Sequence, residues 1–423
     1  MVMVTAMSWR RSTLPNGLTA LFFPRQSTNT TQLSVAVKYG SNQELEENAG
    51  VAHFLEHMVA GGSTKRIQLS RSIENSGGIL DLYTDHEHMM STMDFLPEKT
   101  AEASSILPQL LFTGDFEEEK FNQERKIILN ELAEALDDPA ERIENLLLKS
   151  LFKYHPVKRP VGGYPKTVKQ LTIDQLIKTH RANYVPENMI LILTGNFSEK
   201  SVQEVLEKFQ YQHSSDKYSR NSYPSEAAKI KPLAVKRKAG IVQTYLSIGA
   251  RTVCSNDKDA AVLDLLSAVL SGGTSSRLFV ELREKHALTY DVSSEHNKGS
   301  DFGYFNVNCA VKDKNLTTAR KMIFNEFSKL KTEKTPADEL ERSKNLIVGG
   351  ILRGMDNPQE ALEIIAYLEL QYKNEQALVD YIAKVKAVTS ENIMTAANIY
   401  LDEGILSTVI LQPKNSYNSR ICT

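Results

Sequence analysis

The sequence has little cysteine and no long hydrophobic run, and these absences exclude several classes of protein. Its three cysteines, Cys254, Cys309 and Cys422, are too few and too widely spaced for a disulfide framework, so we expect reduced thiols. No apolar run approaches the ~20 residues of a membrane-spanning helix, and we expect no membrane partner. At the N-terminus no small-residue cleavage site is evident, so we expect no removable leader. These features predict a cytoplasmic protein.

An excess of charge of either sign is also missing. The 423 residues include 50 basic and 52 acidic side chains, for a formal charge of −2. This balance gives no electrostatic reason to expect nucleic acid as a partner. Apolar residues make up 41% and charged residues 24% of the chain, as in ordinary globular proteins. The length is sufficient for two domains of about 200 residues each.

A polar stretch divides the chain into two halves. The stretch QHSSDKYSRNSYPSEAAKIKPLAVKRK has almost no periodic apolar positions, which is typical of a linker or long loop with a lead-in strand. We therefore predict domains at 1–212 and 239–423, joined by a linker at 213–238. On both sides, strand-like runs such as MILILTG alternate with helical patterns such as VLDLLSAVL.

Ordered matches between the halves indicate a duplication. MVAGGSTKR resembles VLSGGTSSR, and ERKIILNELAEALDDPAE resembles SKNLIVGGILRGMDNPQE, with Pro139 matching Pro358. Helical periodicity alone would not repeat the Gly-Gly and Asp-x-Pro positions. In this alignment His53 falls opposite Asp264, Glu56 opposite Ser267, and His57 opposite Ala268. Glu131 falls opposite Gly350, so the alignment predicts one potential metal site per chain.

The stretch HFLEH has the spacing of a metal site on a helix. Each helical residue advances ~100°, so His53, Glu56 and His57 share one face. Apolar Phe54 and Leu55 lie on the opposite side. Histidines at i and i+4 can bind one ion, and the glutamate can deprotonate a metal-bound water. The alternative is a solvated or internally hydrogen-bonded polar face, and five residues alone do not decide.

A second, glutamate-rich helix offers the third ligand that a catalytic zinc site needs. In FNQERKIILNELAEALDDP, Glu131 shares a helical face with Glu124. Glu134 lies one turn further and stays open as an alternative on spacing alone. Such a helix usually presents its glutamates to solvent, and this interpretation applies to residues 117–119.

HxxEH followed by ERxxxxxE resembles the pitrilysin/insulinase family of zinc peptidases, whose motif inverts the commoner HExxH order. The resemblance covers nearly the whole chain, from TLPNGLTALFF to SGGTSSRLFVELREKHALTYDVSSEH. The half-sized members, which include the mitochondrial processing peptidase and its prokaryotic relatives, match this length. The resemblance implies an α+β fold of two homologous domains, each an antiparallel sheet packed with helices. It also implies that two chains dimerise as a clamshell around a chamber.

The resemblance implies a role for each matching residue of the first half. His53, His57 and Glu131 match the zinc ligands, which implies one Zn²⁺ per chain. Glu56 matches the general base, and Glu124 matches a supporting carboxylate near the metal.

The second half carries a further match. Arg283 and Tyr290, in LREKHALTY, match the arginine–tyrosine pair that binds the substrate backbone and the developing oxyanion in the family. At this spacing alone, such residues would normally be surface or packing residues. Because the chain has both this pair and the metal motif, we expect a self-sufficient homodimer, with a heterodimer with a sister subunit as the alternative.

Departures from the family pattern lie around the motif. AGGST stands where relatives more often have Phe-Lys-Gly-Thr, and Asp81 and Leu82 stand where an Asn-Ala pair is usual. Asp81 is a candidate substrate contact. Glu141, in the acidic run DDPAERIE, is a second candidate for basic substrate residues, with a solvated helix turn as the alternative. His86 and His88 have strand-face spacing and are predicted to be structural or substrate-contacting.

We therefore expect a zinc metalloendopeptidase that hydrolyses unfolded peptides or a peptide precursor inside an enclosed chamber. One alternative is a non-catalytic or partner-dependent subunit of the same fold in a heteromeric complex. Such subunits usually lose motif residues, whereas this chain keeps them. A second alternative, a zinc-stabilised binding module, needs a closed four-ligand site, and the cysteines lie far from the motif.

Overall fold

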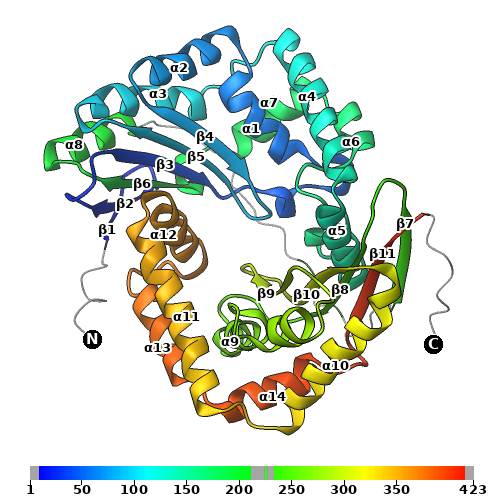
Figure 1. Ribbon diagram of the computed structural model, residues 1–423. Coiled ribbons are helices and arrows are strands. Elements are labelled where there is room, and N and C mark those ends of the chain that lie inside the picture. The colour runs from blue at the N-terminus through cyan, green and yellow to red at the C-terminus, as the bar shows by residue number, and fades with distance from the viewer. Residues whose placement is uncertain (1–8, 211–222, 224–225, 227–232, 415–423) are drawn as a thin grey trace. The chain divides into compact units, whose positions relative to one another are not determined.

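The computed structural model describes residues 9–210, 223, 226 and 233–414. The expectations for the N-terminal leader, for Cys422 and for most of the linker 213–238 concern residues outside these ranges. Two β-sheets form, and each belongs to a compact unit of its own (Figure 1). Cys254 and Cys309 are free thiols, as predicted. In the described part of the chain, no helix is both long enough and apolar enough to cross a bilayer.

The sheet of the first unit has six strands: β1 (Arg10–Thr13), β2 (Thr19–Pro24), β3 (Thr31–Val37), β4 (Ile79–Thr84), β5 (Met89–Phe95) and β6 (Met189–Gly195). They lie in the order β1-β2-β6-β3-β5-β4. All neighbours are antiparallel except β2 and β6, which are parallel. Strand β4 is therefore an edge of a predominantly antiparallel sheet.

The helices of this unit come mostly from the first half of the chain. They are α1 (Val51–Gly61), α2 (Thr64–Asn75), α3 (Thr100–Phe112), α4 (Glu118–Asp137), α6 (Pro165–Gln170), α7 (Ile173–Asn183), α8 (Glu199–Lys208) and, from the second half, α12 (Pro358–Tyr372).

The sheet of the second unit has five strands: β7 (Leu233–Lys238), β8 (Thr244–Arg251), β9 (Val292–Lys298), β10 (Gly303–Val311) and β11 (Ser407–Pro413). Its order, β7-β11-β8-β10-β9, repeats that of the first sheet without β1, including one parallel pair, β7 with β11. Its helices are α5 (Pro139–Leu151), α9 (Ala260–Ser271), α10 (Leu316–Thr332), α11 (Ala337–Asp356), α13 (Ala377–Ala387) and α14 (Ser390–Tyr400). The repeated order is the arrangement expected of two homologous domains.

The compact units differ from the predicted contiguous domains 1–212 and 239–423. The first unit runs up to Glu134 and then takes Arg159–Tyr223 and Gly354–Ala377, and the rest forms the second unit. Helix α5, from the first half, packs on β8 and β11 of the second sheet. Helix α12, from the second half, packs on β6 and β3 of the first sheet (Figure 1). Each half of the chain thus gives one helix to the sheet of the other half.

The duplicated sequence explains where these exchanges occur. Helices α4 and α11 have equal lengths, and each is followed after one residue by a proline, Pro139 or Pro358, that begins the next helix. Proline is favoured at the first helical position and cannot continue the preceding helix, so the chain changes direction at both points. The apolar face of α5, which includes Ile143, Leu147 and Leu151, predicts burial but not the sheet that it covers.

Helix α1 is embedded in the first core by its apolar side. Phe54, Leu55 and Met58 are fully buried in one cluster with side chains of the first sheet. Burial of side chains of this size stabilises a fold by about 1.5–3 kcal/mol each. The opposite face carries the polar residues of HFLEH, which are only partly buried. The amphipathic helix predicted from the sequence is confirmed.

A buried carboxyl group and a buried guanidinium lie at the two ends of α1. At the N-terminus, Gly50 has a left-handed φ of 98° and no side chain to act as a cap. The carboxylate of Glu44 takes this role and accepts the N–H groups of Gly50 at 2.9 Å and Ala52 at 2.7 Å. Near the C-terminus, Arg66 donates to the carbonyl of Val59 at 2.8 Å. Both side chains thus satisfy backbone groups at the helix ends that have no partner within the helix.

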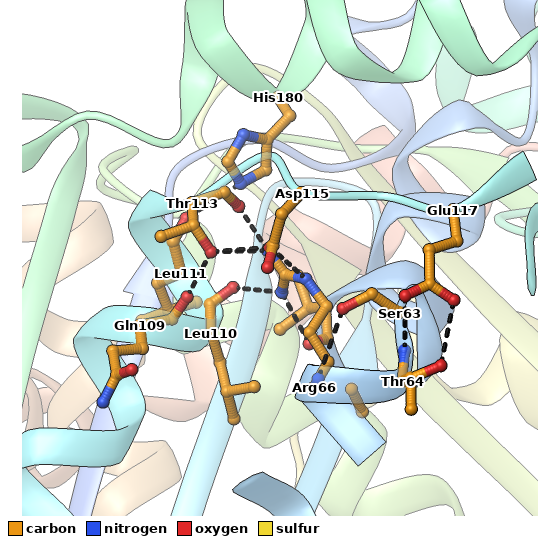
Figure 2. Close-up of polar contacts among 12 residues, drawn as sticks. Ser63, Thr64, Arg66, Gln109, Leu110, Leu111, Thr113, Asp115, Glu117 and His180 are labelled. Carbon is orange, nitrogen blue, oxygen red and sulfur yellow. Dashed lines mark hydrogen bonds and ion pairs between the residues drawn. The ribbon is translucent and has the colours of Figure 1, made fainter. Parts of the chain in front are cut away.

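Arg66 connects three segments of the first unit (Figure 2). Its side chain is fully buried and donates to the carbonyl oxygens of Leu110 and Thr113, at the end of α3. Its Nε donates to Asp115 at 3.0 Å, and its guanidinium lies 4.8 Å from the ring centroid of Phe116. The guanidinium of Arg66 therefore links the end of α1, the start of α2 and the end of α3.

Replacement of Arg66 by methionine should lower the free energy of unfolding by roughly 3 kcal/mol, because buried carbonyl groups and Asp115 lose their partner. Arg10→Met is a suitable control, since it breaks an exposed ion pair with Glu199 that is worth about 1 kcal/mol or less. Urea unfolding of both variants measures the difference. Equal losses in the two variants would contradict the proposed role of Arg66.

Candidate metal centre

Helices α1 and α4 bring His53, His57 and Glu131 together. The Oε2 atom of Glu131 lies 3.3 Å from Nε2 of His57 and 3.8 Å from Nε2 of His53. One potential ligand atom from each residue lies within 4.8 Å of the others. Within the described ranges, this is the single group of three or more histidine, cysteine and acidic side chains that meets this condition.

Packing between the two helices accounts for this placement. The rings of Phe54 on α1 and Phe121 on α4 stack at a centroid distance of 4.8 Å. Ile128 and Leu132 of α4 are buried, and Glu131 lies at the edge of this buried face, where 44% of its side chain is exposed. Glu134, the alternative third ligand on spacing alone, is not part of the group.

Glu124 lies behind His57, as the resemblance implies. Its Oε2 atom is 3.1 Å from Nδ1 of His57. This contact places the ring proton on Nδ1 and leaves the lone pair of Nε2 directed at Glu131. Burial lowers the pKa of His57, but the hydrogen bond to Glu124 and the charges of Glu131 and Glu56 outweigh it and raise the pKa above 6.5.

His53 has a different environment. Burial, together with the neighbouring His57, lowers its pKa to about 4. The ring is therefore neutral at physiological pH, which is the form that binds a metal ion. Its Nδ1 atom is buried and has no hydrogen-bond partner in the described part of the chain.

Glu56 lies on the same face of α1 and is not in the three-residue group. Burial raises its pKa above 4.5, and the charges of Glu131 and Asp81 raise it further. A raised pKa makes a carboxylate a better proton acceptor and donor near neutral pH. Asp81 lies on β4, so the edge strand brings this candidate substrate contact close to Glu56.

The donor set fits zinc. Two imidazole nitrogens and one carboxylate oxygen are a common set of catalytic zinc ligands, which leaves a fourth position open. Ligand atoms at ~2.0–2.1 Å from a tetrahedral ion are about 3.3 Å apart. The distances from Glu131 to His57 and His53, 3.3 Å and 3.8 Å, are close to this value.

A cavity of about 460 Å³ opens beside these residues. It is lined by residues of α1, α2, β4 and α4: Glu56, His57, Ala60, Gly61, Ile67, Ser70, Arg71, Glu74, Leu82 and Glu124. Because Glu56 and His57 form part of its wall, a group that enters the cavity lies next to the candidate metal centre.

The edge strands of the two sheets differ. In β4, no backbone group has a hydrogen bond beyond the ladder with β5 among the described residues. In β9, the N–H of Ser294 donates to Ser271 at 2.7 Å, and its carbonyl accepts from Ser267 at 2.6 Å. Ser267 is the counterpart of Glu56, so the second unit uses the equivalent helix position to close its own sheet edge.

The predicted arginine–tyrosine pair lies in the second unit. Arg283 belongs to the π-helix Phe279–Lys285. Its guanidinium is 4.4 Å from the ring centroid of Tyr290, and 79% of Tyr290 is exposed. The two side chains are therefore together, while their catalytic role stays a prediction. Glu141 also lies in the second unit, on α5, and its role in substrate binding likewise stays a prediction.

The two histidines of DHEH make local contacts. His88 pairs with Asp85 at 3.0 Å, and Nδ1 of His86 is 3.0 Å from the hydroxyl of Ser41. These contacts favour the structural interpretation over the substrate-contacting one.

Sequence reasoning missed Glu44 and Gly61. Glu44 stands in the run ELEEN, where nothing in the pattern distinguishes it from the exposed Glu46 and Glu47. A Cβ atom at Gly61 would lie 2.8 Å from Oε1 of Glu124, so glycine gives Glu124 the space that it occupies beside His57. The only signal for Gly61 was the departure AGGST.

Comparisons with known proteins cover both halves of the chain. The family model described as "Insulinase (Peptidase family M16)" matches residues 22–164, and "Peptidase M16 inactive domain" matches residues 170–347. A Rickettsia bellii protein named "Uncharacterized zinc protease" is 30% identical over 386 residues, 90% of this chain and 90% of that protein. A similarly named Mycobacterium tuberculosis protein is 26% identical over 422 residues, 98% of this chain and 95% of that protein.

The fold also matches a solved structure. The crystal structure of a protease from Helicobacter pylori has a TM-score of 0.89, at 21% sequence identity. The match covers 96% of this chain and 99% of that one, so the likeness in fold extends over both units.

Gly61→Ala should lower the pKa of His57 in the metal-free protein. The new methyl group displaces the flexible end of Glu124, and His57 then loses the hydrogen bond that raises its pKa. NMR titration of the imidazole signals measures this shift. Gly350→Ala in α11 is the matched control, because its Cβ has no atom within 4 Å. An unchanged His57 pKa in Gly61→Ala would contradict the prediction.

Proposed function

Because the chain belongs to peptidase family M16, the insulinase family, we propose that it is a zinc metalloendopeptidase that cleaves unfolded peptides or a peptide precursor. The observation that carries the proposal is the convergence of His53, His57 and Glu131 beside Glu56, at the wall of a cavity. The names of its relatives as zinc proteases support the metal.

The residues of the first unit have distinct parts in the proposed reaction. His53, His57 and Glu131 would hold a Zn²⁺, and the bound ion would supply Lewis-acid activation of a water molecule. Glu56 accepts the proton of the attacking water and passes it to the nitrogen of the leaving amine. Glu124 keeps His57 in the tautomer whose Nε2 is a ligand.

An extended peptide is the substrate form that the first sheet supports best. Among the described residues the outer edge of β4 has unpaired backbone groups, and a peptide strand can pair with them with little dependence on its sequence. Asp81 lies on this strand near Glu56 and is a candidate contact for the residues next to the cleaved bond. A substrate side chain there can enter the cavity lined by Ala60 and Leu82.

The second unit supplies the remaining functional groups in this proposal. Arg283 and Tyr290 donate to the substrate backbone and to the oxyanion, because a cation and a phenol hydroxyl are suitable donors to growing negative charge. Glu141 binds basic residues of the peptide. The working form is a cytoplasmic homodimer that encloses a chamber, and this chamber excludes folded proteins by size.

Glu56→Gln should abolish cleavage of a mixed library of unfolded peptides while zinc stays bound, because the amide cannot accept the proton. Mass spectrometry of the products and metal analysis of the protein measure the two effects. A chelator should also stop cleavage, and added zinc should restore it.

Equal activity of Glu56→Gln and the wild type would contradict the role of Glu56. No cleavage by the zinc-loaded wild type would favour the alternative, a non-catalytic or partner-dependent subunit, which co-purification of a sister chain would then establish.

Tyr290→Phe should lower kcat by about 100-fold and leave KM nearly unchanged, because it removes one donor to the oxyanion. Tyr154→Phe is the control, since Tyr154 is a similarly exposed tyrosine of the second unit that has no part in the proposal. Steady-state kinetics on one cleaved peptide measure both variants. Similar values for the two would contradict an oxyanion role for Tyr290.

A further inference from the structure

The orientation of His53 depends on the first turn of α1 more than that of His57 does. Glu124 orients His57 through its Nδ1 atom, whereas the Nδ1 atom of His53 has no such partner among the described residues. The backbone that carries the His53 side chain therefore sets its direction. Ala52 directly precedes His53 in the first turn of α1, and its N–H group donates to Glu44.

Glu44 is in turn held by an arginine. Arg159 is 6% exposed, and its Nη2 atom donates to the carbonyl oxygens of Ser41 at 3.0 Å and Glu44 at 2.9 Å. The guanidinium fixes the backbone from which the Glu44 side chain extends. Burial raises the pKa of Glu44 to about 8, while the bonds from Ala52 and Gly50 and the charge of Arg159 act in the opposite direction. Glu44 and Arg159 therefore form one buried support for the start of α1.

The loop after Arg159 lies between α1 and α4, the two helices that carry the candidate metal ligands. A Cβ at Gly163 would be 2.2 Å from the carbonyl oxygen of Ala49, so this loop contacts the chain directly before α1. A Cβ at Gly162 would be 3.6 Å from Nδ1 of His53 and 2.9 Å from Cδ2 of Leu132, the neighbour of Glu131 on α4. The position of Arg159 thus affects the surroundings of both His53 and Glu131.

We propose that Glu44 and Arg159 are positioning residues of the metal centre. They hold the first turn of α1 and the adjoining loop, so that His53 is directed at the ion that it shares with His57 and Glu131. The proposal rests on the proposed function, because it requires that these three residues bind a metal. It extends that function to two buried residues that contact neither substrate nor metal.

Glu44→Gln tests the proposal with a nearly unchanged side-chain shape. The amide has one acceptor oxygen, whereas the first turn of α1 presents two N–H groups, so one N–H meets an NH₂ group. Loss of a partner bonded directly to a metal ligand typically weakens metal binding by 10–100-fold, and Glu44 acts one step further back, through the backbone N–H of Ala52. We expect about a 10-fold weaker affinity for Zn²⁺, measured by competition with a chelating dye, and a changed absorption spectrum of the Co²⁺-loaded protein.

Glu226→Gln is the matched control. In the second unit, the Glu226 carboxylate accepts the N–H groups of Lys153, Tyr154 and His155 and pairs with Arg251 at 3.0 Å. It is therefore also a carboxylate that binds backbone N–H groups and faces an arginine. Both variants should lower the melting temperature, but only Glu44→Gln should weaken Zn²⁺ binding and change the Co²⁺ spectrum.

Arg159→Lys gives a second test if Glu44→Gln does not fold. Lysine keeps the charge, but its shorter side chain leaves the ammonium short of the position from which Nη2 serves both carbonyl oxygens, so a smaller, several-fold loss of Zn²⁺ affinity is expected. Wild-type affinity and spectrum in a folded Glu44→Gln or Arg159→Lys variant would overturn the proposal and leave both residues with a structural role only. A wild-type protein that binds no Zn²⁺ would instead overturn the proposed function, so the two failures are distinguishable.

Discussion

The burial of one face of α1 is the constraint on which the rest of the candidate site depends. Phe54, Leu55 and Met58 are buried in the first core, and their burial fixes the rotation of α1 about its axis. The polar residues on the opposite side of the helix therefore face outward. The same packing fixes α4, because Phe121 stacks on Phe54. The polar residues are thus positioned by apolar neighbours. Hydrogen bonds from Glu44 and Arg66 at the helix ends then fix its position along the axis.

The two units show how one architecture takes different roles. In the first, the polar face of its helix is directed at a potential ion, and the adjoining edge strand β4 has no further backbone partner in the described part of the chain. In the second, Ser267 and Ser271 bind the backbone of the edge strand, and Asp264 binds the side chains of His296 and Lys298. The duplicated helix thus stabilises its own sheet. The family description of an inactive domain agrees with this difference.

Local signals in the sequence predict much of this structure. The strand of MILILTG and the helix of VLDLLSAVL are confirmed, because their apolar patterns are strong and short in range. The spacing in HFLEH correctly predicts that its polar residues share one face of α1, because helical spacing is set by the backbone alone. The polar strands β1 and β9 were missed, because their residues lack that apolar pattern. Which sheet α5 covers, and what Glu44 contacts, depend on distant segments that no local pattern identifies.

The exchange of helices between the halves has a consequence for synthesis on the ribosome. The first sheet ends at β6, Met189–Gly195, yet one of the helices that cover it, α12, spans Pro358–Tyr372. While the intervening residues are translated, apolar surface of the first sheet lacks its native cover. The nascent chain therefore has a long interval in which chaperones or premature aggregation compete for that surface. Synthesis of the first half alone does not complete the first unit.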